Sequence, residues 1–186
     1  MSVKLKEIDK IEILTLQDNY IDVAAFDGTE IVQRALPIKD MEIKNSILAE
    51  HGFSAIVTIT ADERPRSLLF DFGFSEHGAA YNADALGFDL TTIEAMVLSH
   101  GHMDHFGGLE QLAQRVGKKG IELVVHPTAF RTSRYIKVTE EFKIGLPALK
   151  RERFENAGIS LVESKEPRML LDDSVLFLGE IPKQTE

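Results

Sequence analysis

The sequence contains no cysteine. This absence excludes disulfide bonds, thiolate nucleophiles and thiolate metal ligands, so any metal ion must be bound by nitrogen and oxygen atoms. Basic residues are also few, because 21 lysines and arginines face 30 acidic residues and leave a net charge of −9. A charge of this sign argues against sequence-independent nucleic-acid binding and against attachment to an anionic membrane surface.

Long apolar runs are missing as well. No stretch approaches the roughly 18 consecutive apolar residues of a membrane-spanning helix. Residues 1–10 alternate charged and apolar side chains and do not form the apolar core of a signal peptide. Internal repeats, low-complexity tracts and Pro/Ser-rich linkers are absent too. We therefore expect one structural unit over residues 1–186, located in the cytoplasm, with 44% hydrophobic residues available for its core.

The order of apolar segments predicts an α/β protein with alternating strands and helices. Strands are expected where β-branched and apolar residues gather, at 11–16, 53–60, 67–71, 95–99, 122–125, 159–162 and 175–178. The turn-like residues 61–66 predict a hairpin between the second and third of these strands. Helices are expected at 78–86, 109–116 and 147–157, the last opened by Pro147. Thr91 and Glu94 have the spacing of a capping box, which favours a helical turn.

Four potential metal ligands lie within six residues, directly after an expected strand and before an expected helix. They are His100, His102, Asp104 and His105. Side chains two residues apart on an extended chain point the same way, so His100 and His102 can approach one ion together. The turn into the helix directs Asp104 and His105 toward a second ion. Imidazole nitrogens with a carboxylate favour zinc, iron or manganese over calcium or magnesium; the alternative is a group of solvated loop side chains.

The pattern His100-x-His102-x-Asp104-His105 resembles the signature of the metallo-β-lactamase superfamily. The upstream segment that ends in Asp71-Phe-Gly73 is similar to the Asp-x-Gly strand end of that family. Shorter strings resemble one branch, the dihydropterin ribofuranosyl-aminobenzene phosphate synthase-like proteins. These strings are Asp18-Asn-Tyr20, His51-Gly-Phe-Ser54, Val125-His-Pro127 and Gly179-Glu-Ile-Pro182.

The resemblance implies an αββα sandwich with metal ions at one edge of its two sheets. It implies that His100 and His102 bind one ion, that Asp104 and His105 bind another, and that Asp71 orients the cluster from behind. Two divalent transition-metal ions, zinc first and iron or manganese as alternatives, would activate a bound water, and Asp104 would take part in catalysis.

The family pattern continues beyond the Gly179 string with further metal ligands, none of which this sequence contains. His126 does not match a family ligand and is expected to lie near the site without coordinating. We therefore expect the N-terminal portion of the sandwich only. Such a portion would expose an apolar sheet face, which predicts self-association or pairing with a complementary C-terminal chain.

The one basic zone of this acidic chain spans residues 131–153. Within it, Arg131 and Arg134 could bind the phosphate or carboxylate of a small anionic substrate, and Glu180 could line the same site; a solvated helix face is the alternative. We favour a metal-dependent, hydrolase-like enzyme that acts on a small phosphorylated or ester substrate, with a pterin-related compound as one candidate. The alternative is a non-catalytic remnant or subunit whose incomplete metal site needs a complementary chain.

Overall fold

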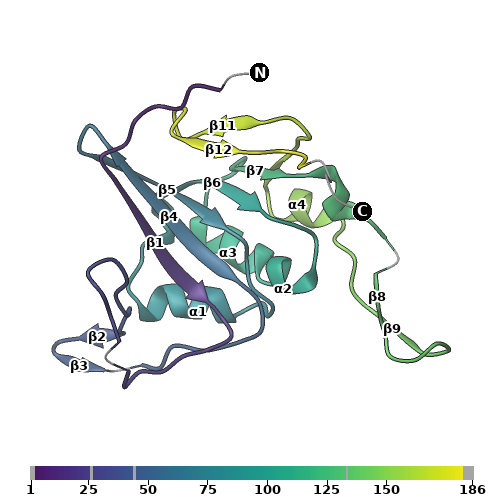
Figure 1. Cartoon of the computed structure of the whole chain (residues 1–186), viewed down its shortest axis with the longest axis horizontal. Helices are drawn as coiled ribbons and strands as arrows, with labels where there is room; N and C mark the ends of the chain where they lie inside the picture. The colour runs from purple at the N-terminus through teal and green to yellow at the C-terminus, as the bar shows by residue number, and fades with distance from the viewer. Residues whose placement is uncertain (1–2, 26, 44, 133, 182–186) are drawn as a thin grey trace.

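The computed structural model describes residues 3–25, 27–43, 45–132 and 134–181, so Pro182 of the Gly179 string lies outside the described residues. Its main sheet has six strands in the order β1-β4-β5-β6-β7-β10. These strands are β1 (Lys10–Gln17), β4 (Ser54–Ala61), β5 (Arg64–Phe70), β6 (Ile93–Leu98), β7 (Glu122–Val125) and β10 (Ser160–Glu163). β1, β4 and β5 are antiparallel neighbours, whereas β5, β6, β7 and β10 run parallel (Figure 1). The sheet is therefore mixed, with antiparallel strands at one side and parallel strands joined by helical crossovers at the other.

Helices cover one face of this sheet (Figure 1). They are α1 (Gly78–Ala85), α2 (Met103–Phe106), α3 (Leu109–Val116) and α4 (Glu152–Asn156), together with the 3-10 turns η1 (Leu90–Thr92) and η2 (Pro127–Phe130). Successive side chains of a strand point to opposite faces. On β6, Met96 and Leu98 therefore pack in the main core with the helices, whereas Ala95 and Val97 pack on the other side. The central strands are thus buried on both faces.

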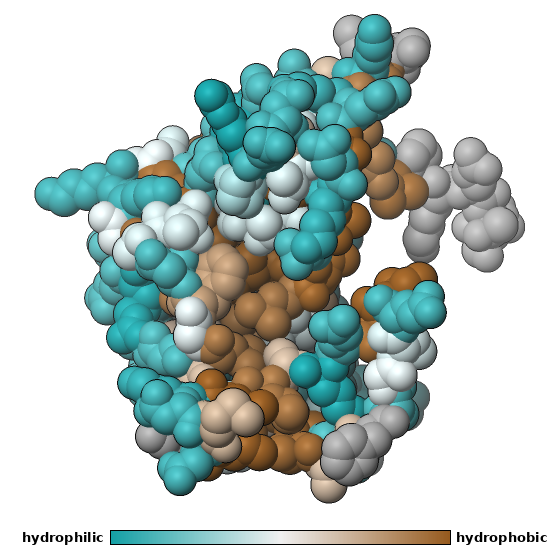
Figure 2. All heavy atoms as spheres, turned by 90° about the vertical axis from the view of Figure 1, so that its left-hand side faces the viewer, coloured by the Kyte–Doolittle hydropathy of each residue, from teal (hydrophilic) through white to brown (hydrophobic). Residues whose placement is uncertain are grey.

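A two-stranded sheet covers part of the opposite face. It consists of β11 (Arg168–Leu170) and β12 (Val175–Phe177), and Leu170 and Leu171 are buried in a second core against β5, β6 and β7. Over β1 this face is open, because Ile11 is 55% exposed and Ile13 is 63% exposed. Figure 2 shows this side of the molecule, where brown apolar side chains form a broad patch between polar rims. The described residues therefore form a helical layer, a main sheet and a short second sheet of the sandwich.

Most predicted elements are confirmed. The predicted helix 109–116 and strand 122–125 coincide with α3 and β7, and the other predicted strands differ from the observed ones by at most three residues at an end. The predicted hairpin is the antiparallel pair β4–β5, which turns at Asp62 and Glu63, both with positive φ. These segments were predictable because β-branched and apolar residues are concentrated in them.

One predicted helix is too long, and one predicted turn forms with a different cap. The helix expected at 147–157 is limited to α4; Pro147 and Leu149 adopt no regular structure, and Leu149 is buried in the main core. A helical turn does form near residue 91, but its cap is Asp89 instead of Thr91. The carboxylate of Asp89 accepts a hydrogen bond from the backbone N–H of Thr91.

Two small hairpins were not predicted. They are β2 (Ile38–Lys39) with β3 (Glu42–Ile43), and β8 (Tyr135–Lys137) with β9 (Lys143–Gly145). The β8–β9 hairpin is exposed and extends away from the body of the molecule (Figure 1). The basic zone 131–153 therefore contains an exposed hairpin and the start of a short helix, so its solvated part is a hairpin and not the helix face given as the alternative. Among the described residues, none of the helices has the length and apolar character needed to cross a membrane.

Candidate metal centre

The candidate site lies where three parallel strands end. Asp71 follows β5, Ser99 and His100 follow β6, and His126 follows β7. The carboxyl ends of parallel strands share one edge of the sheet, so these side chains are brought together although they are far apart in sequence. His102 precedes α2, and Asp104 and His105 lie within the single turn of that helix. The edge that the sequence singles out by its motif is therefore also the edge at which α/β folds place ligands.

Asp71 is buried directly behind this edge, with 1% of its surface exposed. Its carboxylate accepts three hydrogen bonds of 2.7 Å each, from the backbone N–H of Ser99, from the Ser99 hydroxyl and from Nδ1 of His105. Its backbone has a φ of +56°, a conformation that aspartate tolerates better than most residues. The structure thus brings Asp71 into contact with the histidine cluster, where its hydrogen bond orients the His105 ring.

The three histidines of the motif form a compact group. Nε2 of His100 lies 3.0 Å from Nδ1 of His102, and the centroids of the His100 and His105 rings are 4.2 Å apart. Nε2 of His105 lies 3.4 Å from Oδ2 of Asp104. Nδ1 of His100 lies 2.9 Å from the Ser99 hydroxyl, which is itself bonded to Asp71. All four ligands predicted from the sequence therefore lie together.

His51 joins this group although sequence analysis assigned it no role. Its Nε2 lies 3.5 Å from Oδ2 of Asp104. Gly52 makes the approach possible, because a Cβ at this position would collide with the backbone carbonyl of Asp104, and the φ of Gly52 is +119°. The backbone N–H of Phe53 donates to the same carbonyl at 3.2 Å. The available signal was the string His51-Gly-Phe-Ser54, which contributed to the family resemblance without indicating a contact.

The environment shifts the pKa values of two histidines in opposite directions. Burial lowers the pKa of His100, and positive charge on His105 and His102 lowers it further. The hydrogen bond to Asp71 raises the pKa of His105. The neutral form of His100 is therefore favoured, which is the form that binds metal ions. In His105 the Asp71 carboxylate favours a proton on Nδ1 and leaves Nε2 facing Asp104.

The donor atoms fit transition-metal ions as pairs. Two donors bound to one ion at about 2.1 Å lie about 3.0–3.5 Å apart when the angle between them is about 90–110°. The separations of 3.0 Å for His100 and His102 and 3.4 Å for Asp104 and His105 meet this condition. A nitrogen and oxygen donor set also suits zinc, iron or manganese. Within the described residues no group of three or more such side chains converges on one point, so the arrangement consists of pairs.

A cavity of about 180 Å³ adjoins the histidine cluster. It is lined by Ser99, His100, Gly101, His126, Thr128, Ala129, Arg131 and Arg134. Arg131 and Arg134, predicted to bind substrate, therefore share a cavity with His100. Glu180 lies at its side, with Oε2 3.9 Å from Nε2 of His126. Glu180, which was predicted to line the site, therefore lies near His126 and the cavity. It lies outside the group formed by the four motif side chains.

Comparison of the sequence with protein-family models identifies the family. Residues 57–185 match the family model described as the metallo-beta-lactamase superfamily. The chain belongs to this superfamily. The family resemblance stated from the motif is thereby confirmed, and with it the α/β sandwich fold class.

Two curated relatives come from Methanocaldococcus jannaschii. One is named 7,8-dihydropterin-6-methyl-4-(beta-D-ribofuranosyl)-aminobenzene-5'-phosphate synthase; it is 25% identical over 183 residues, which are 97% of this chain and 54% of that protein. The other is an uncharacterized protein, 31% identical over 147 residues, which are 74% of this chain and 49% of that protein. The chain spans about half the length of these relatives. The first relative supports the synthase-like branch expected from the short strings.

Solved structures of the superfamily resemble parts of the chain. The Rm3 metallo-beta-lactamase is 22% identical with a TM-score of 0.41 and covers 70% of this chain and 45% of its own. A flavo di-iron protein from Thermotoga maritima is 15% identical with a TM-score of 0.40 and covers 67% of this chain and 26% of its own.

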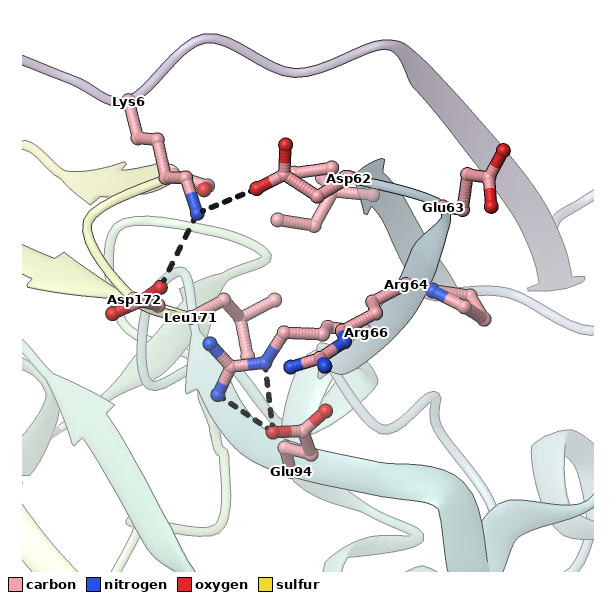
Figure 3. A pocket seen from close by; sticks show the side chains of 12 residues that line it. Lys6, Asp62, Glu63, Arg64, Arg66, Glu94, Leu171 and Asp172 are labelled. Atoms are coloured by element: carbon pink, nitrogen blue, oxygen red, sulfur yellow. Dashed lines mark hydrogen bonds and ion pairs between the residues drawn. The ribbon is translucent and has the colours of Figure 1, made fainter.

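A larger cavity in this metallo-β-lactamase superfamily member lies at the other end of the main sheet. It has a volume of about 800 Å³ and is lined by the β4–β5 turn, the start of β6 and the β11–β12 turn (Figure 3). Five of its seven charged groups are paired with one another: Lys6 Nζ lies 3.4 Å from Asp62 and 3.5 Å from Asp172, and Arg66 donates two hydrogen bonds to Glu94. Because these charges are paired within the cavity wall, the smaller cavity beside His100 is the better candidate for a substrate site.

Proposed function

We propose that this chain carries the metal-binding part of a metal-dependent enzyme with hydrolase-like chemistry, acting on a small phosphorylated or ester substrate. The observation that carries the proposal is the pairing of four nitrogen and oxygen donors at separations of 3.0 and 3.4 Å, in front of the buried Asp71 carboxylate. Membership of the metallo-β-lactamase superfamily supports it. Zinc is the first choice of metal, and iron or manganese are the alternatives.

The donor pairs assign residues to two ions. His100 and His102 would hold one ion, and Asp104 and His105 would hold the other, with His51 beside Asp104 as a further donor at 3.5 Å. When bound, such ions supply Lewis acidity that lowers the pKa of a coordinated water toward about 7. Asp71 fixes the orientation of His105 directly and that of His100 through the Ser99 hydroxyl. This hydrogen-bonded support keeps the rings in place without their having to reorganise.

Asp104 is the residue for which we propose a catalytic role. Its side chain is 20% exposed, so its carboxylate reaches the solvent-facing side of the cluster. There the carboxylate oxygen left free when Oδ2 binds the ion could accept a proton or hold a water by a hydrogen bond, while the ring of His105 is held from behind by Asp71. The Asp104 backbone is locked by the hydrogen bond from Phe53 N–H, which limits the positions that its carboxylate can adopt.

The substrate proposal rests on the cavity beside His100. Arg131 and Arg134 line it together with His126, so an anionic group bound there would lie within reach of the metal-binding edge. The named relative from Methanocaldococcus jannaschii is a synthase whose product name contains a dihydropterin and a 5'-phosphate. This name supports a phosphorylated substrate and keeps a pterin-related compound as the first candidate.

Metal analysis tests the proposal directly. After incubation with zinc and removal of the excess, we expect the wild-type chain to retain zinc, and His100→Ala and Asp104→Ala to retain less. His77→Ala is the matched control, because His77 is an exposed histidine before α1 that lies outside the motif. Hydrolysis of a chromogenic phosphate ester should follow the metal content across these variants. Wild-type protein that retains no zinc, iron or manganese would contradict the proposal.

A second candidate function is a subunit that is completed by another polypeptide. Two donors per ion satisfy half of a tetrahedral coordination sphere, and the described residues contain no converging group of three. The open apolar face over β1 offers a surface for such a partner. Under this alternative the isolated chain binds zinc weakly and lacks hydrolytic activity, and both properties appear when the complementary chain is added.

A further inference from the structure

The cavity beside His100 has the size of a subsite. Its volume of about 180 Å³ is smaller than the roughly 300–1,000 Å³ of pockets that enclose whole drug-sized ligands. It therefore accommodates one end group of a substrate whose remainder lies outside. Because His100 forms part of its wall, that end group would lie next to the metal-binding edge.

His126 presents a hydrogen-bond donor that lacks an acceptor. Its Nδ1 accepts a hydrogen bond from the backbone N–H of Thr128 at 3.3 Å and lies 2.7 Å from the Thr128 hydroxyl. A backbone amide can only donate, so the neutral ring carries its proton on Nε2. Nε2 is buried and has no hydrogen-bond partner in the part of the chain that the structure describes. Glu180 is the nearest carboxylate, and its distance of 3.9 Å is too long for a hydrogen bond.

Two arginines add positive charge to the same cavity. The guanidinium of Arg134 donates to the carbonyls of Arg131 and Ala129, and these bonds hold it at the cavity wall. Burial, and then the charge of Arg131, lower the pKa of Arg134. The ion pairs found among the described residues include neither arginine, in contrast to Arg66, Arg151, Arg153 and Arg168. The cavity thus combines two cations with one neutral donor, and its nearby carboxylate, Glu180, faces His126 and is not ion-paired with either arginine within the described part of the chain.

We propose that this cavity binds the phosphate group of the substrate, with Arg131 and Arg134 supplying the charge and Nε2–H of His126 donating a hydrogen bond to a phosphate oxygen. This inference rests on the proposed function and names the end group that the site recognises. It makes His126 a neutral positioning residue and not a metal ligand. Thr128 fixes the tautomer, so the proton stays on Nε2 whether or not phosphate is bound.

Phosphate binding to the chain without added metal tests the subsite by itself. Titration with inorganic phosphate, followed by calorimetry, should give a dissociation constant that rises about 10–100-fold in His126→Phe, because a hydrogen bond to a charged group is lost. His126→Gln should bind within a few-fold of wild type, since its side-chain amide can place a donor near the former Nε2. Arg134→Met should weaken binding as well. Arg64→Met is the matched control, because Arg64 lines the distant larger cavity and is absent from the ion pairs found among the described residues.

A second measurement needs no variant. Nitrogen-15 spectra of the histidine rings should place the His126 proton on Nε2 and should show this signal shifting during the phosphate titration. The proposal is wrong if the proton lies on Nδ1, if the signal does not shift, if His126→Phe binds phosphate like wild type, or if acetate binds as tightly as phosphate. Zinc retention is measured separately, so phosphate binding without zinc retention would leave the subsite standing while the metal-dependent function fails.

Discussion

Nδ1 of His105 lies 2.7 Å from Oδ2 of Asp71, a carboxylate with 1% of its surface exposed. The same carboxylate accepts two hydrogen bonds from Ser99, whose hydroxyl lies 2.9 Å from Nδ1 of His100. One residue at the end of β5 therefore orients a ring after β6 and a ring in α2.

Replacement of Asp71 should weaken metal binding without touching a proposed ligand. We expect Asp71→Ala to lower zinc affinity about 10–100-fold, the usual effect of removing the hydrogen-bonded support of a metal-binding histidine. Competition with a chromophoric chelator measures the change. Asp84→Ala is the control, because Asp84 is a half-exposed aspartate paired with Arg115 on the surface. Equal zinc affinities of Asp71→Ala and wild type would show that the carboxylate does not orient the site.

Substitution of Gly101, the glycine within the histidine motif, should lower the stability of the fold. A Cβ on Gly101 would collide with the backbone carbonyl of Ala129, so Gly101→Ala must displace η2 from the end of β6. We expect a loss of about 1–3 kcal/mol in the free energy of unfolding, the range for overpacking a tight site. Urea unfolding measures it. Gly145→Ala in β9 serves as the control, because a Cβ there meets nothing within 4 Å and stability should hardly change; equal effects of both substitutions would contradict the close approach.

The elements that were predicted correctly are those in which sequence and packing agree. β7 consists mostly of apolar residues, and α3 has apolar residues along one face. In both elements these apolar residues are buried. The helix expected at 147–157 forms only over Glu152–Asn156, because Pro147 marks a possible first helical residue without fixing where the helix begins. The exposed β8–β9 hairpin was missed because each of its strands is only three residues long and its apolar side chains lie outside the core.

Part of the candidate site could likewise be predicted from the sequence, and part could not. His100, His102, Asp104 and His105 were found because they are close in sequence, so their proximity in space follows from a short turn. His51 was missed because its approach to Asp104 depends on Gly52 packing against a distant backbone carbonyl. Contacts of this kind carry no periodic signal, and an isolated histidine in a loop is more often solvated than functional.

The open apolar face should cause association between chains. Ile11 and Ile13 are exposed on β1, on the face that β11 and β12 leave uncovered. We expect wild-type protein to associate as its concentration rises, and Ile11→Lys/Ile13→Lys to remain monomeric with similar stability, because charged side chains on an edge strand oppose pairing. Sedimentation velocity distinguishes the two. Ile136→Lys/Ile144→Lys places the same charges on the protruding β8–β9 hairpin and should still associate; a wild-type chain that stays monomeric at high concentration would refute this expectation.

Stability in acid should depend on the pair formed by Arg151 and Glu163. Nε and Nη2 of Arg151 donate to both carboxylate oxygens of Glu163, at 2.6 and 2.7 Å, and this bonding lowers the pKa of Glu163 below its ordinary value of 4.5. A carboxylate with a lowered folded-state pKa stabilises the fold fully above the unfolded value, and the contribution is lost as the pH falls through the folded value.

Glu163→Gln isolates this contribution, because Arg151 also lies over the Phe130 ring and should keep its place. We expect the variant to lose about 0.5–1 kcal/mol of unfolding free energy near neutral pH, since the pair is partly exposed to solvent. The difference should shrink as the pH falls below 4.5, where the unfolded chain begins to take up a proton at Glu163, and should vanish once the pH is below the lowered folded-state pKa. Urea unfolding at a series of pH values measures the difference. A difference that stays constant from neutral to acidic pH would mean that the carboxylate charge contributes nothing and that the substituted amide merely packs less well.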